Sequence, residues 1–140
     1  MPKKGANLIF EQVMLFMIGI GIFVVTFSIF TSYEGHYSSS IVEDQLGEVS
    51  DWVVSNILGV SADEGMNATL KVTVPAMVGN ERYKINLTQE GLIVSTLDTE
   101  RSVFSPLSRL NETMSLGGSF STTHGGEFII YKRGSQIIIG

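Results

Sequence analysis

The stretch from Gln12 to Tyr33 constrains this chain most, because it contains no charged residue and consists mainly of Ile, Phe, Val, Met and Leu. Its 22 residues would form a helix of roughly 33 Å at about 1.5 Å per residue, enough for a bilayer core of about 30 Å. We therefore expect residues 6–33 to form a membrane-spanning helix. The rest of the chain must then lie on one or the other side of a membrane.

The distribution of charge predicts on which side of the membrane each end of the chain lies. Lys3 and Lys4 precede the apolar stretch, and no further Lys or Arg occurs before Lys71. Because basic residues favour the cytoplasmic side, we expect a cytoplasmic N-terminus and an extracytoplasmic C-terminal part. The 140 residues carry 9 basic and 14 acidic side chains, without a basic cluster, which argues against nucleic acid as a partner. The absence of cysteine excludes disulfides and favours assembly with neighbours.

The residues in front of the apolar stretch do not form an ordinary signal peptide. Such a peptide has a shorter apolar core followed by a small-x-small cleavage site. Here the small residues Gly5 and Ala6 precede the apolar run and directly follow Lys3 and Lys4. This order, with Glu11 a few residues later, resembles the class III leader of type IV pilin-like proteins, especially the archaeal ones.

The resemblance implies that a prepilin peptidase removes residues 1–5 by cutting between Gly5 and Ala6, after the basic Lys4. The apolar helix would stay in place as a polymerisation element, and the mature net charge would be −5 − 2 = −7. Glu11 then becomes the sixth mature residue, whereas bacterial pilins have the carboxylate at the fifth. A cut after Ala6 would restore the fifth position but would move Lys4 away from its usual place, so we favour Gly5.

Glu11 is the one acid within the apolar segment. A carboxylate at that depth costs free energy unless it is paired. The family resemblance suggests the new α-amino group of a neighbouring subunit as its partner. The alternative is that Glu11 reaches the membrane interface and stays hydrated.

The pattern after Tyr33 predicts an amphipathic continuation of the helix over residues 34–58, with a possible break at Gly35 and at 38–40. Asp44, Glu48 and Asp51 share another face, either solvated or facing a basic neighbour. We expect Trp52 in the core or in an interface, and a helix end near Leu58. One apolar stripe follows the helical period: Val42, Leu46, Val49, Val53 and Ile57.

Residues 66–140 change to a period of two, which predicts an extracellular antiparallel β domain, sandwich-like, and hence an α+β fold. We expect a hairpin of 70–74 with 83–87, a third strand at 92–97 and a long connection over 98–118 that contains at most one short strand or turn. A short strand should begin at Phe120, and 128–132 should pair with 136–139 around Arg133-Gly134-Ser135. Because residues 137–139 are all Ile, this last strand should lie within a sheet or against another subunit.

The β domain holds three sequons, which begin at Asn67, Asn86 and Asn111. They are compatible with a surface glycoprotein, although a chain rich in Ser and Thr also produces sequons by coincidence. The strand pattern places Asn86 on the solvent side. His36 and His124 fit no metal-ligand spacing, and no nucleophile or phosphate-binding motif is present. We therefore expect neither an enzyme nor a cofactor.

These expectations favour a pilin or minor pilin, a structural subunit of an archaeal adhesive surface filament. Its partners would be the lipid bilayer before assembly, prepilin peptidase, the membrane assembly platform and further pilin subunits in a homo-oligomeric filament. It would be single-pass in the membrane first and extracellular afterwards. The alternative is a permanently anchored extracytoplasmic interaction protein, such as an archaellum stator-like component.

Overall fold

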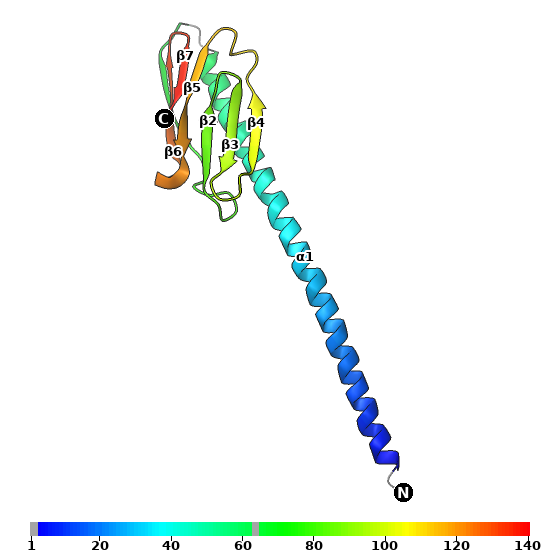
Figure 1. Ribbon diagram of the computed structural model, residues 1–140. Coiled ribbons are helices and arrows are strands. Elements are labelled where there is room, and N and C mark those ends of the chain that lie inside the picture. The colour runs from blue at the N-terminus through cyan, green and yellow to red at the C-terminus, as the bar shows by residue number, and fades with distance from the viewer. Residues whose placement is uncertain (1–2, 63–64) are drawn as a thin grey trace. The chain divides into compact units, whose positions relative to one another are not determined.

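The computed structural model describes residues 3–62 and 65–140 and divides the chain into two compact units, Met1–Ser39 and Ser40–Gly140 (Figure 1). The helix α1 (Lys3–Ser61) contributes to both units. It is helical through the possible break at residues 35–40 and ends three residues beyond the expected Leu58. An α+β fold is confirmed: one long helix followed by a seven-stranded sheet.

The first unit consists of the N-terminal part of α1. From Asn7 to Glu34 every side chain is exposed, although most are large and apolar. A helix satisfies its own backbone hydrogen bonds, so such a segment needs no partner for its backbone. It does need an apolar environment for its side chains.

In the second unit, α1 packs on one face of the sheet through the predicted stripe. Its residues, from Val42 to Ile57, are all buried, and Val60 extends the stripe by another turn. Ser50 is buried as well, and its hydroxyl forms a hydrogen bond of 2.7 Å with the hydroxyl of Ser105 in β4. The strands are β1 (Ala68–Thr73), β2 (Tyr83–Leu87), β3 (Gly91–Thr96), β4 (Ser102–Pro106), β5 (Ser115–Ser121), β6 (Glu127–Arg133) and β7 (Gln136–Ile139), with a 3-10 turn, η1 (Thr122–His124), before β6.

The seven strands form a single sheet in the order β1-β6-β7-β5-β2-β3-β4. All neighbouring strands are antiparallel except β5 and β7, which run parallel. One face of the sheet packs against α1, so the helix and the sheet form two layers. The other face of the sheet is open. We call this second surface the open face.

The expected hairpin of residues 70–74 with 83–87 is wrong. β1 pairs with β6, while β2 pairs with β3 and β5, and three strands separate β1 from β2. Residues 74–82 cross between them, and the Gly79-Asn80 turn closes only a bridge between Val78 and Glu81. The alternating pattern identified the buried face of each strand correctly, but it carries no information on which strand is the neighbour.

The segment 98–118, expected to be a long connection with at most one short strand or turn, contains all of β4 and also the beginning of β5. Its polar residues hide the strand pattern, because β4 lies at the edge of the sheet and buries little. The strand expected to begin at Phe120 begins at Ser115 instead.

The C-terminal hairpin is confirmed. β6 pairs with β7, with Gly134 in the turn at φ 56°. The strand of three isoleucines lies inside the sheet between β6 and β5, where Ile137 and Ile139 are buried against α1. This position removes the open apolar edge that β7 would otherwise present.

Lys132 is a buried cation that the sequence did not reveal. It is 1% exposed, and its Nζ donates to the carbonyl of Ser61, 3.4 Å away, at the last residue of α1. Positive charge is favourable at a helix C-terminus, where carbonyl groups lack intrahelical partners. Lys132 therefore joins the end of the helix to the sheet.

Gly118 provides a sharp test of the packing between β5 and β7. It has φ 113°, and a Cβ atom there would overlap the backbone of Ile139, whereas a Cβ on the adjacent Gly117 would meet no atom within 4 Å. We expect Gly118→Ala to lower the free energy of unfolding by about 1–3 kcal/mol, and Gly117→Ala to change it by less than about 1 kcal/mol. Denaturant titration of both variants in detergent, followed by circular dichroism, measures this. Equal values for the two would contradict the observed pairing.

Tyr83 predicts a pH dependence of stability. Its side chain is fully buried in β2, its hydroxyl donates to the carbonyl of Pro75, and burial raises its pKa from 10.0 to about 12. In the unfolded chain Tyr83 ionises near pH 10, while in the folded chain it stays neutral until about pH 12. The stabilising contribution is thus complete below pH 10 and is lost as the pH rises from 10 to 12.

Unfolding titrations of the wild type and Tyr83→Phe over this range isolate the contribution of Tyr83 from that of other groups. We expect the stability of the wild type to fall more steeply than that of Tyr83→Phe between pH 10 and 12. Parallel curves would show that the Tyr83 hydroxyl ionises with the same pKa in both states.

Candidate functional site

The apolar part of α1 is the first candidate site. Residues Asn7–Glu34, 28 in number, form one helix that is long and apolar enough to cross a membrane, and none of its most apolar window is buried. At about 1.5 Å per residue this segment extends roughly 42 Å. Its chemistry is that of a surface for lipid or for other apolar helices.

Glu11 lies in the second turn of this segment and is exposed. The residues three and four positions away, which share its side of a helix, are Asn7, Leu8, Met14 and Leu15. None of these is a cation. A counter-charge for Glu11 must therefore come from outside its own stretch of helix.

The expected cleavage residues Lys4, Gly5 and Ala6 lie in the first turns of α1. The side chains of Lys4 and Ala6 lie outside the described part of the structure. Gly5 is exposed, and an added Cβ atom would meet no atom within 4 Å. A larger side chain at this position is therefore compatible with the fold.

The three sequon asparagines all belong to the second unit. Asn67 is exposed, and its Oδ1 accepts a hydrogen bond of 3.1 Å from the backbone N–H of Gly134. Asn86 lies on the open face between Ile93 and Ser119, as the strand pattern predicted. Asn111 is half-buried in the turn after β4, and its carbonyl accepts from Nε2 of Gln89.

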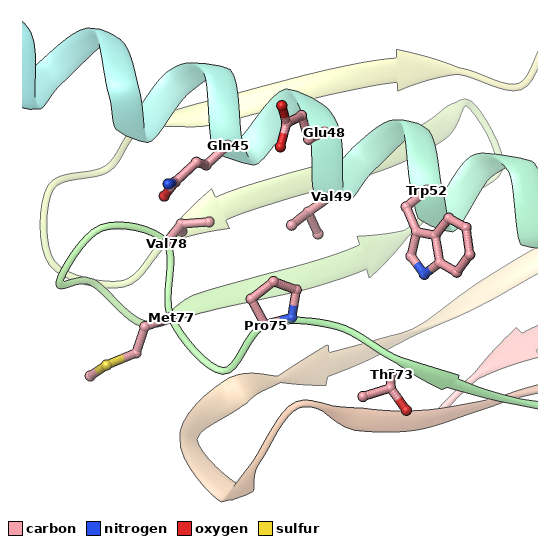
Figure 2. Close-up of a pocket in the computed structure, with 8 residues that line it drawn as sticks. All are labelled: Gln45, Glu48, Val49, Trp52, Thr73, Pro75, Met77 and Val78. Carbon is pink, nitrogen blue, oxygen red and sulfur yellow. The ribbon is translucent and has the colours of Figure 1, made fainter.

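A groove between α1 and the connection from β1 to β2 is the second candidate site. Its volume is about 390 Å³. Figure 2 shows the side chains of Gln45, Val49 and Trp52 extending from the helix toward this connection. Gln45 holds the connection in place, because its Oε1 accepts a hydrogen bond of 2.7 Å from the N–H of Gly79. The lining residues are Gln45, Glu48, Val49, Trp52, Thr73, Pro75, Met77 and Val78.

Two large side chains of this groove face solvent. Trp52 is 56% exposed and Met77 is 48% exposed. Trp52 is therefore not a core residue of this unit, and its expected place in an interface stays a prediction. Asp44, Glu48 and Asp51 are also exposed, so the acidic face of the helix is solvated in the single chain.

A second hollow, on the open face, has a volume of about 350 Å³ and is lined by Tyr131, Arg133, Gln136 and Ile138. The register of β6 and β7 produces it, since Tyr131 pairs with Ile138 and Arg133 with Gln136. We call it the Arg133 pocket. The sequence gives one signal for it, because Tyr131 and Arg133 alternate with the buried Ile130 and Lys132.

His124 lies in η1, and the side chain of His36 is outside the described part. Within residues 3–62 and 65–140, no group of three or more His, Asp or Glu side chains is placed to hold a metal ion.

Comparison of the chain with protein-family models, with curated proteins and with solved structures found no match.

The exposure of Trp52 leads to a prediction about stability. Because its indole makes few contacts in the single chain, we expect Trp52→Ala to change the free energy of unfolding by less than about 1 kcal/mol. Ile57→Ala, one turn further along α1 and fully buried, should lower it by about 2–5 kcal/mol. Denaturant titration at low protein concentration compares the two. A cost for Trp52→Ala as large as that for Ile57→Ala would place the indole in the core.

Proposed function

We propose that this chain is a structural subunit of an archaeal type IV pilus-like surface filament, matured by prepilin peptidase and polymerised through α1. The observation that carries this proposal is the helix segment Asn7–Glu34, which is apolar on all sides and exposed at every residue, and whose one carboxylate before its last residue is Glu11. A plain anchor needs the apolar surface but gains nothing from the acid.

The apolar helix would serve twice. Its backbone hydrogen bonds are internal, so it can leave lipid and pack among identical helices without exposing backbone groups. Lys3 and Lys4 would hold the precursor with its N-terminus in the cytoplasm until cleavage removes them. The second unit, with its sequons, would then lie outside the cell on the filament surface.

Glu11 supports assembly because it requires a counter-charge from another molecule. Cleavage after Gly5 creates an α-amino group on Ala6, five residues before Glu11. Five residues correspond to roughly 7.5 Å along a helix axis. An amino group of one subunit therefore meets Glu11 of a parallel neighbour that is displaced by about this distance.

The leader provides the decisive measurement. In cells with prepilin peptidase, we expect the mass of the purified wild-type protein to correspond to a chain that begins at Ala6, and sheared surface filaments to contain it. Gly5→Leu should leave an uncut precursor in the membrane fraction. Gly19→Leu, which also has open space around the glycine, should be cut like the wild type and serves as the control.

One outcome would overturn the proposal: a wild-type protein that retains Met1 and occurs only in membranes, which is the result expected for a permanently anchored interaction protein. Normal maturation of Gly5→Leu would refute the assigned cleavage site alone. A mass corresponding to a chain that begins at Asn7 would move the cut to Ala6.

A further inference from the structure

We propose that the second unit carries both halves of a head-to-tail contact between copies of this chain. Trp52, with the acidic side of α1 around it, docks into the Arg133 pocket of the next copy. The inference rests on the proposed function, since it supplies an outer contact between the subunits of a filament. It assigns that contact to two surfaces on the same chain.

Charge complementarity identifies a second copy as the occupant. Between Ser40 and Ser61 the helix has four acidic residues, Glu43, Asp44, Glu48 and Asp51, all exposed, and no Lys or Arg. The strands of the open face carry the opposite charge. The charged residues on this face are Lys71, Lys84, Glu127 and Arg133, of which Lys71 and Glu127 form an ion pair of 2.7 Å; Lys132 of β6 is buried on the opposite face. An acidic surface and a basic surface on one chain attract between copies.

The two surfaces lie on different faces and toward different ends of the sheet. The groove beside Trp52 includes Thr73, the last residue of β1. The Arg133 pocket includes Tyr131, which pairs with Thr69 near the start of β1. Thr69 and Thr73 are four residues apart, about 13 Å along a strand. Because different patches meet, the contact is heterologous and leaves one unused patch at each end of every oligomer.

The side chains suit each other chemically. Trp52 is the chain's one tryptophan and is exposed, as expected for an interface anchor. The Arg133 pocket is lined by the aromatic ring of Tyr131 and by Ile138, which is 39% exposed. The guanidinium group of Arg133 can lie over an indole face. Glu48 lies one turn before Trp52 on the same side of α1, where it can pair with Arg133 of the neighbour.

Engineered cysteines test the contact directly, because the native chain has none. In the full chain, as filaments and as detergent-extracted protein, we expect Glu48→Cys combined with Arg133→Cys to give a ladder of disulfide-linked dimers, trimers and larger species on mild oxidation. Each single variant should give no ladder. Glu43→Cys combined with Arg133→Cys is the matched control, since position 43 is also exposed and acidic but lies on a different side of α1, and it should stay monomeric.

A charge exchange gives an independent readout. Arg133→Glu should weaken self-association of the extracted protein by about tenfold or more, because like charges then meet across the contact. Adding Glu48→Arg to this variant should restore association. Sedimentation of the three proteins measures their self-association. Association of the wild type should also shift the fluorescence of Trp52 to shorter wavelength, because the indole becomes buried in the contact.

Several results would overturn the inference. Filaments of the Glu48→Cys, Arg133→Cys variant without a ladder would show that assembly uses other surfaces, although the proposed function would stand. Dimers from Arg133→Cys alone would indicate an isologous contact of the open face. Conversely, retention of Met1 with a ladder from extracted protein would reject the filament but support the contact.

Discussion

The structure depends on a helix that satisfies its backbone internally while leaving its side chains without partners. From Asn7 to Glu34 every residue of α1 is exposed and the segment is strongly apolar. Water cannot accommodate this surface, so it must be covered by lipid or by other protein. The first unit is a single helix segment and has no other element that could provide this cover.

The same helix changes its role after Ser40. Its apolar residues narrow to one stripe, which packs on a seven-stranded sheet and leaves an exposed, wholly acidic side. The sheet in turn stabilises the C-terminal end of the helix, because the buried Lys132 of β6 donates a hydrogen bond to the carbonyl of Ser61. Without disulfides, this packing and the central position of β7 hold the second unit together.

Sequence periodicity predicted the features that depend on residues close together in the sequence. It failed to predict the pairing of strands that are far apart in the sequence. The stripe from Val42 to Ile57 and the hairpin of β6 and β7 followed from local spacing. The pairing of β1 with β6 and the parallel pairing of β5 with β7 did not, since alternation fixes a buried face and not a neighbour. The contacts of Lys132 and Ser50 are equally non-local. Of the candidate site residues, Gly5 and Glu11 stand out by position in an otherwise apolar sequence, whereas the Arg133 pocket emerges only from the register of two strands.

The charge distribution sets a further condition on any parallel assembly of this chain. No Lys or Arg occurs between Gly5 and Leu70, so neighbouring helices placed side by side bring acid against acid beyond the apolar segment. Such repulsion destabilises contacts between the helices themselves. The Lys and Arg residues of the second unit all follow Leu70, and on the open face of its sheet Arg133 and Lys84 are exposed. In the contact that we propose, the open face of one sheet would bring these cations to the acidic helix of the next copy, and the attraction would weaken with rising ionic strength.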